Sequence, residues 1–178
     1  MSAGASFRDG YVSADFLTRS YRISGDVRLR GEPLLDRLND HMALFIELER
    51  MFVSPLLNPA VLTGNYDMGN VRKNILGMVV LAQADDALPR RRGQYEGRDH
   101  IARPVFIVTA GFEVRGDLRL HPTVDVANFI RTTPEQYIPI FDAEAVMTLE
   151  SSVVYRGGAL LVNREQIEVF SVEKRQRA

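Results

Sequence analysis

The chain contains an internal duplication, and this feature constrains its fold more than any other. Residues 16–30 (FLTRSYRISGDVRLR) align with residues 107–121 (IVTAGFEVRGDLRLH) at an offset of 91, with five identical pairs. Further on, residues 45–53 (FIELERMFV) align with residues 137–145 (YIPIFDAEA) at an offset of 92, and the last strands return to an offset of 91. An alignment that loses and regains its register is typical of duplication followed by drift in the loops. We therefore predict two tandem repeats.

The predicted boundaries are residues 12–84 for repeat one and 103–175 for repeat two. Between them, residues 85–102 (DDALPRRRGQYEGRDHIA) are charged and contain glycine and proline, which is typical of an exposed linker or long loop. Two copies are too few for a solenoid, which generally needs three or more repeats. The sequence therefore indicates a tandem pair.

The matched strands show the clearest local pattern. In both copies, apolar and polar side chains alternate over nine residues, which predicts a strand with one buried and one exposed face. Gly25 and Gly116 lie on the apolar face of this strand. A glycine at such a position indicates a strong bend or a close approach of another backbone.

The rest of each repeat reads as one helix followed by further strands. A short helix with an apolar face is predicted near residues 34–38 and 126–130. The next strand changes phase at Phe141-Asp142, and repeat one slips at the equivalent point, which indicates a β-bulge. Two short strands around a polar turn at Asn163–Gln166 end the chain. We predict a mainly β (α+β) fold of two small barrel-like repeats, each with one short helix, packed about a pseudo-two-fold axis.

Two family resemblances accompany this prediction. The step Phe141-Asp142-Ala143-Glu144, an apolar strand, the basic turn Asn163-Arg164 and a last strand resemble the closing half of an Sm-like barrel. A helix interrupts the pattern and the Arg-Gly turn of that family is absent, so its RNA contacts are not implied here. Across both repeats, the run G-D-[VL]-R-L, a Leu-rich helix, F/Y-I-x-[LI] and V-N-R-x-x-I resembles an uncharacterised bacterial domain family. This resemblance implies the fold and no chemistry.

Composition limits the classes of function. The net charge is −1, so no global field draws the chain to nucleic acid or to an acidic membrane. The absence of cysteine excludes disulfides and thiolate sites. Residues 1–16 carry no basic region followed by an apolar run, and no stretch approaches about 18 apolar residues. We expect a cytoplasmic protein without membrane insertion.

The sequence offers little for catalysis. His41, His100 and His121 fall in different predicted elements without ligand spacing, and neither a phosphate-binding loop nor a nucleophile elbow is present. Carboxylates are plentiful, but none of them forms a distinctive pair. We therefore expect no enzyme activity, no cofactor and no metal site.

The duplicated Asp-x-Arg pairs are the first polar candidates: Asp26 with Arg28, and Asp117 with Arg119. On antiparallel strands about a pseudo-two-fold axis, Asp26 would face Arg119 while Arg28 would face Asp117. Such inter-repeat ion pairs would each contribute about 0–1 kcal/mol if exposed. A charged site duplicated about the axis is the functional alternative.

Two segments that differ between the repeats are candidate binding regions. The possible binding loop comprises Arg90, Arg91, Arg92 and Arg98. These arginines suit phosphate, as nucleic acid or nucleotide, although nearby acidic residues dilute the charge and favour a solvated loop. The possible docking patch comprises Met51, Phe52, Leu56 and Leu57. Core packing is the alternative for this apolar run.

Three functions remain open at this stage. The first is a non-catalytic protein-interaction, regulatory or assembly module with a protein partner or a homo-oligomer. The second is nucleic-acid or nucleotide binding through the arginine-rich linker, and the third is a small-molecule carrier with a pocket between the repeats.

Overall fold

The computed structural model describes residues 10–173, so residues 174 and 175, which end the predicted second repeat, lie outside the described residues. Repeat one contains β1 (Tyr11–Leu17), β2 (Tyr21–Arg28), α1 (Leu34–Asn39), β3 (Phe45–Pro55), β4 (Gly64–Arg72), the 3-10 turn η1 (Lys73–Ile75) and β5 (Met78–Leu81). Repeat two contains β6 (Ile101–Thr109), β7 (Phe112–Leu120), α2 (Val126–Thr132), β8 (Tyr137–Met147), β9 (Val154–Asn163), η4 (Arg164–Gln166) and β10 (Ile167–Val172). The order of elements is therefore the same in both copies.

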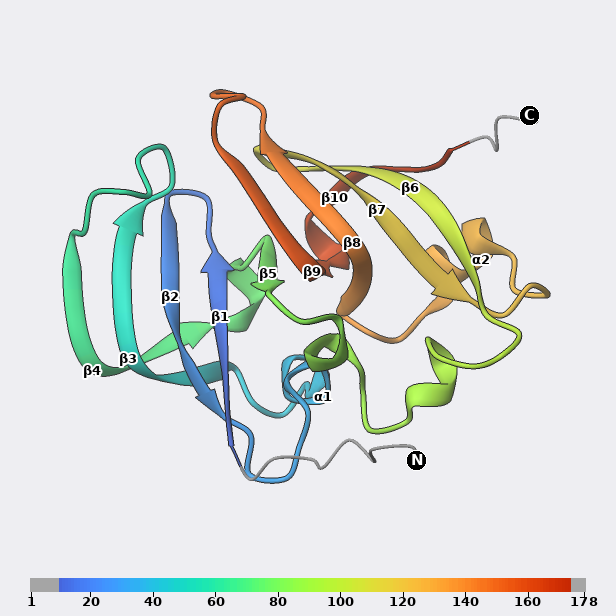
Figure 1. Cartoon of the computed structure of the whole chain (residues 1–178), viewed down its shortest axis with the longest axis horizontal. Coiled ribbons are helices and arrows are strands. Elements are labelled where there is room, and N and C mark those ends of the chain that lie inside the picture. The colour runs from blue at the N-terminus through green and yellow to red at the C-terminus, as the bar shows by residue number, and fades with distance from the viewer. Residues whose placement is uncertain (1–9, 174–178) are drawn as a thin grey trace.

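All ten strands within residues 10–173 belong to one antiparallel sheet in the order β10-β6-β7-β8-β9-β5-β1-β2-β3-β4. The two halves of the sheet lie side by side in Figure 1, with β1 to β4 in one half and β6 to β10 in the other. Sequence reasoning missed the first strand of each repeat, β1 and β6. The alternation of Val12, Ala14 and Phe16 was the available signal, because these side chains are buried while their neighbours Tyr11 and Ser13 are exposed.

The mainly β prediction is confirmed, but two finer points need correction. The described part of the sheet is open, with β10 and β4 as its edges, and closed barrels are not seen. The repeats also do not meet about a pseudo-two-fold axis. Such an axis would pair equivalent strands, whereas β5 of repeat one pairs with β9, the counterpart of β4, in repeat two. The repeats are therefore joined head to tail.

The bulge prediction is confirmed in both repeats. The register of β2 with β3 shifts between Ser24 and Asp26, and that of β7 with β8 shifts between Arg115 and Asp117. The bulged residues Arg50 and Asp142 have φ angles of 49° and 47°. Both are non-glycine residues in the left-handed region, which persists only where the surrounding structure fixes the backbone.

A single hydrophobic core runs through both repeats. The helix α1 lies beneath the junction of the two halves and contacts β8, whereas α2 lies at the outer side of repeat two (Figure 1). Accordingly, Leu38 of α1 is fully buried, while its counterpart Phe129 on α2 is only partly buried. The position of each helix relative to the junction explains this difference between equivalent residues.

The segment between the repeats packs against the core. It contains the 3-10 turns η2 (Ala84–Ala87) and η3 (Arg92–Gln94). Ala87, Leu88 and Tyr95 from this segment are buried among the core residues. Although the linker is rich in charged residues, these apolar side chains anchor it to the core.

Candidate functional site

The pairing of β5 with β9 joins the two repeats into one sheet, and this contact is called the junction below. Its register pairs Met78 with Val162 at one end and Leu81 with Ala159 at the other. All four of these side chains are fully buried. The paired segments, residues 78–81 and 159–162, are apolar on both faces, as expected for strands covered on each side. The junction therefore resembles the interior of a continuous sheet.

Two asparagine side chains reinforce the contact between the repeats. The side chain of Asn163 donates from Nδ2 to the Leu76 carbonyl at 2.8 Å and accepts from the Glu165 N–H at 3.1 Å. The Asn39 side chain, at the end of α1, binds both backbone groups of Tyr137, accepting from its N–H at 2.7 Å and donating to its carbonyl at 3.1 Å. Each asparagine thus satisfies backbone groups that the sheet leaves unpaired, which is costly to lose at a buried site.

A basic residue after the fourth strand caps the helix in each repeat. Buried Lys73 donates from Nζ to the carbonyls of Arg37 and Asp40, at the C-terminal end of α1. Its counterpart Arg164 donates from Nη1 to the Ile130 carbonyl in the last turn of α2 at 3.5 Å, and from Nε to the Glu135 carbonyl beyond the helix at 3.1 Å. Cations stabilise the unpaired carbonyls at a helix C-terminus. Sequence reasoning matched these two residues in the repeat but did not predict this role.

The buried hydroxyl of Tyr137 predicts a loss of stability at alkaline pH. Burial raises the pKa of Tyr137 above its usual value of about 10, and it donates to the Lys73 carbonyl. Because the folded-state pKa is raised, the stabilisation is complete below about pH 10 and is lost as pH rises further. Burial lowers the pKa of Lys73, which acts in the opposite direction.

Tyr137→Phe isolates the tyrosine contribution. Above about pH 10, its free energy of unfolding should fall less steeply than that of the wild type, by up to about 1.4 kcal/mol per pH unit. Urea unfolding across this pH range measures the slope. Tyr66→Phe, at an exposed tyrosine on β4, is the matched control and should retain the wild-type slope. Equal slopes for wild type and Tyr137→Phe would contradict the prediction.

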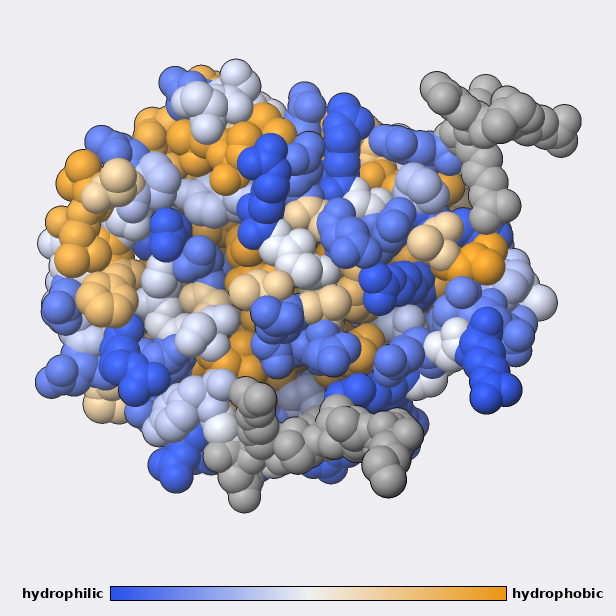
Figure 2. Space-filling view, in the orientation of Figure 1, coloured by the Kyte–Doolittle hydropathy of each residue, from blue (hydrophilic) through white to orange (hydrophobic). Residues whose placement is uncertain are grey.

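The two free edges of the sheet carry exposed apolar side chains. On β4, Tyr66 is 52% exposed and Met68 is 58% exposed. On β10, Val169 is 47% exposed and Val172 is 42% exposed. Figure 2 shows apolar atoms gathered at the end of the molecule where β4 forms the edge. An edge strand also presents unpaired backbone N–H and C=O groups, so both edges are able to accept another strand.

The predicted docking patch is divided between the core and the surface. Leu56 is buried, and its carbonyl accepts from the Tyr155 hydroxyl at 3.4 Å. Met51 is partly buried against the core, whereas Phe52 and Leu57 are exposed. The four residues therefore do not form one exposed surface, because Leu56, which directly follows β3, is buried.

The duplicated Asp-x-Arg residues form ion pairs within each repeat. Asp26 pairs with the bulged Arg50 at 2.6 Å, and Arg119 pairs with the bulged Asp142 at 2.9 Å. The strands β2 and β7, which carry the two motifs, are not neighbours in the sheet. The predicted pairing of Asp26 with Arg119 and of Arg28 with Asp117 therefore does not form. Each repeat instead uses the member of the motif whose charge is opposite to its bulged residue.

The linker arginines are held in different ways. Arg90 binds α1 and the turn before it, donating from its backbone N–H to Asp36 in the helix and from Nη2 to the Gly31 carbonyl in the turn, both at 2.8 Å. Arg92 pairs with Glu96 at 3.7 Å. Arg91 and Arg98 are exposed. The structure therefore does not collect the four predicted arginines into one binding surface.

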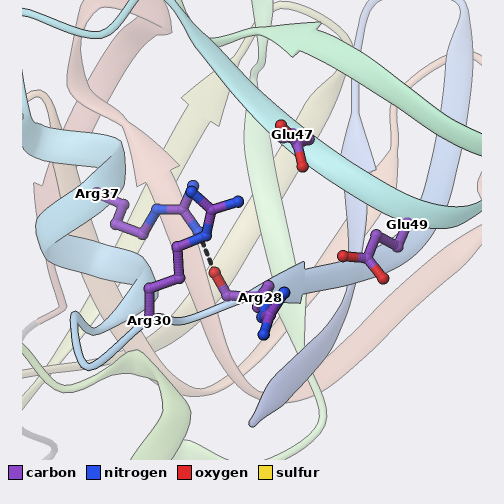
Figure 3. Close-up of a pocket in the computed structure, with 5 residues that line it drawn as sticks. All are labelled: Arg28, Arg30, Arg37, Glu47 and Glu49. Atoms are coloured by element: carbon purple, nitrogen blue, oxygen red, sulfur yellow. Dashed lines mark hydrogen bonds between the residues drawn. The ribbon is translucent and has the colours of Figure 1, made fainter. Parts of the chain in front are cut away.

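A second set of arginines lies close to that turn. Arg28, Arg30 and Arg37 surround a hollow of about 40 Å³ together with Glu47 and Glu49 (Figure 3). Arg37 donates to the Arg28 carbonyl across this hollow. The two carboxylates offset much of the positive charge, which weakens this hollow as an anion site.

A wider hollow of about 350 Å³ lies over the sheet and reaches both repeats. Its lining includes the charged residues Asp15, Asp26, Arg50 and Arg156. Arg156 pairs with Glu144 at 3.1 Å, and Asp15 pairs with Arg22 at 3.2 Å. This hollow differs in character from the apolar pocket that the carrier hypothesis predicts, and that hypothesis stays a prediction.

Comparison of the chain with protein-family models, curated proteins and solved structures finds no match. Within residues 10–173, His, Asp and Glu side chains do not gather in a group of three or more that suits a metal ion. No helix in the same range has the length and apolar character needed to cross a membrane. The function must therefore be inferred from the geometry of the chain itself.

Proposed function

We propose that this chain is a non-catalytic protein-interaction and assembly module that binds partners by strand addition at the free edges of its sheet. The observation that carries the proposal is a difference in exposure: residues buried at the junction have exposed counterparts on the two edge strands. Leu81 and Ala159 face each other at the junction and are fully buried. Their repeat counterparts, Val172 on β10 and Met68 on β4, are 42% and 58% exposed at the two edges.

Strand addition uses both properties of such an edge. Main-chain hydrogen bonds supply affinity, and alternate side chains supply specificity. Natural edge strands are commonly protected by charged side chains, above all lysine, or by proline. β4 (GNYDMGNVR) contains neither lysine nor proline, and its charged residues are Asp67 and Arg72. The apolar Tyr66 and Met68 on this edge favour a partner strand with apolar side chains of its own.

Nucleic-acid or nucleotide binding through the linker is less well supported. Arg90 and Arg92 bind protein groups, and the hollow beside Arg28 contains two carboxylates. Binding through phosphate contacts would weaken steeply as salt is raised, because bound counterions are released. Strand addition depends mainly on backbone hydrogen bonds and apolar contact, so it is expected to tolerate salt.

The test compares two variants of the tagged chain for recovery of the same partner from the native host. Tyr66→Lys/Met68→Lys alters the β4 edge, and Arg90→Ala/Arg91→Ala/Arg92→Ala alters the linker. We expect the edge variant to lose at least about tenfold in affinity, equivalent to about 1.4 kcal/mol. The linker variant should bind as the wild type does.

The salt dependence provides a second readout. Recovery of the partner should change little between about 50 and 200 mM salt. Leu149→Lys, at an exposed apolar residue outside both edges, controls for the general effect of adding a surface charge. Binding that is lost in the linker variant, retained in the edge variant and steeply salt-dependent would overturn the proposal in favour of nucleic acid.

A further inference from the structure

The strand order of the two repeats carries information about assembly. Repeat one reads β5-β1-β2-β3-β4 across the sheet, and repeat two reads β10-β6-β7-β8-β9 in the same direction. The junction joins the first strand of one series to the last strand of the other. The contact is therefore heterologous, and it leaves β4 and β10, the counterparts of β9 and β5, uncovered at opposite edges.

We propose that a second copy of this chain pairs its β10 with β4 of the first copy and so repeats the internal junction between molecules. This inference rests on the proposed function and names the partner at the free edges. Because the contact is heterologous, its repetition produces a ring when the rotation closes and a filament when it does not. Both edges are used once in each molecule.

The internal junction fixes the register of this contact. Shifting the junction pairs by the repeat offset of 91 places Val172 of one copy opposite Met68 of the next, as Leu81 lies opposite Ala159. The same shift places Val169 opposite Val71. Next to this pair, Glu168 falls opposite Arg72, and both are exposed. The transferred register therefore brings together two apolar pairs and one pair of opposite charges. Its two middle pairs, Phe170 with Asn70 and Ser171 with Gly69, each include a polar or small residue.

The start of β3 is also less covered than its counterpart, the start of β8. Tyr137, at the start of β8, is fully buried beside α1, whereas its counterpart Phe45, at the start of β3, is 50% exposed. In the proposed contact, α2 of the neighbouring copy takes the place of α1. The partly buried Phe129 and Ile130 of α2 are then available to cover Phe45. Exposed apolar groups thus lie on both sides of the same predicted interface.

The contact copies only part of the internal junction. Beyond Ala159, the junction depends on Gly157 and Gly158, which lie against the backbone of residues 81–84. Their counterparts on β4 are Tyr66 and Asp67, whose side chains leave no room for the same approach. The interface between molecules is therefore limited to the strand pairs from Met68 to Arg72. A smaller contact is expected to be weaker than the internal one and to depend on concentration.

Single cysteines test the contact directly, because the chain contains no cysteine of its own. Met68→Cys and Val172→Cys are prepared as separate full-length proteins carrying different tags, mixed, and exposed to a mild oxidant. We expect a mixed disulfide between the two differently tagged variants to form at least about tenfold faster than a disulfide between two copies of the same variant. Both substitutions replace exposed side chains, so the fold is expected to tolerate them.

Leu149→Cys mixed with Val172→Cys is the control, because Leu149 is 83% exposed and lies outside the proposed contact. Equal crosslinking in the control mixture, faster crosslinking of Met68→Cys with itself, or no mixed disulfide at concentrations that favour association would each overturn the proposal. If the mixed disulfide does not form but Tyr66→Lys/Met68→Lys still releases the partner from the native host, the edge binds another protein. In that case the proposed function stands and this inference fails.

Discussion

Replacing Gly157 by alanine is expected to lower the free energy of unfolding by about 3 kcal/mol. A Cβ atom at this position would lie 2.4 Å from the Leu81 carbonyl oxygen and 3.1 Å from that of Ala159. Both contacts are with backbone, so the added methyl group is accommodated only if β9 moves away from β5. This movement opens the junction that joins the two repeats, where Leu81 and Ala159 are fully buried.

Urea unfolding of the purified variant measures this loss. Gly93→Ala is the matched control, because a Cβ atom at Gly93 meets nothing within 4 Å. The control should remain within about 0.5 kcal/mol of the wild type. If Gly157→Ala were as stable as Gly93→Ala, the close approach of β9 to β5 would be wrong.

The two bulge glycines should differ in their tolerance of alanine. A Cβ atom at Gly116 would lie 2.7 Å from the Ala143 Cβ and 2.8 Å from both the Ile140 Cγ2 and the Phe141 carbonyl oxygen. The equivalent Cβ atom at Gly25 would lie 3.2 Å from its nearest neighbours. Gly116→Ala is therefore expected to cost about 2–3 kcal/mol and Gly25→Ala about 1 kcal/mol.

In this comparison, each glycine variant serves as the control for the other, because the two positions are equivalent in the duplication. Both glycines occupy the same position in the repeat, and both lie opposite a bulge in the next strand. Thermal and urea unfolding of the two variants measure the difference in stability. Equal losses, or a larger loss for Gly25→Ala, would show that packing at the two bulges does not follow the distances above.

Local patterns were sufficient to predict the repeat, the helix and the bulge. The predicted close approach at the matched glycines is confirmed, because the backbone of the next strand lies within 3.2 Å of a Cβ atom at Gly25 and within 2.8 Å at Gly116. The bulges and the close approach at the glycines depend on steric contacts between adjacent strands, and the alternation of side chains along each strand indicates where these contacts fall. Lys73 and Arg164 were also matched by the alignment, although their role as helix caps required the fold.

The joining of the repeats was predicted wrongly, since alternation identifies the buried face of a strand but not its neighbour. One signal was present. Met78–Leu81 (MVVL) and Ala159–Val162 (ALLV) are continuously apolar, whereas their counterparts on β10 (VFSV) and β4 (MGNV) are not. Continuous apolar runs indicate strands covered on both faces. This difference between the copies distinguishes the strands at the junction from those at the edges.

The candidate site was harder to predict for the same reason. The Asp-x-Arg pairs required knowledge of which strands are adjacent, and the structure gives each motif a partner on the bulge of its own repeat, Arg50 or Asp142. The exposed positions Met68 and Val172 look like ordinary strand residues in the sequence. Their significance depends on the comparison with their buried counterparts at the junction.

Amide hydrogen exchange at rising protein concentration tests whether β4 of one copy pairs with β10 of the next. In the proposed assembly, β4 and β10 are the free halves of the contact that β9 and β5 complete within the chain. Amides of β5 and β9 should be protected at every concentration, and those of β4 and β10 should become protected together as concentration rises. Edge strands that exchange equally fast at all concentrations, or protection of one edge without the other, would contradict it.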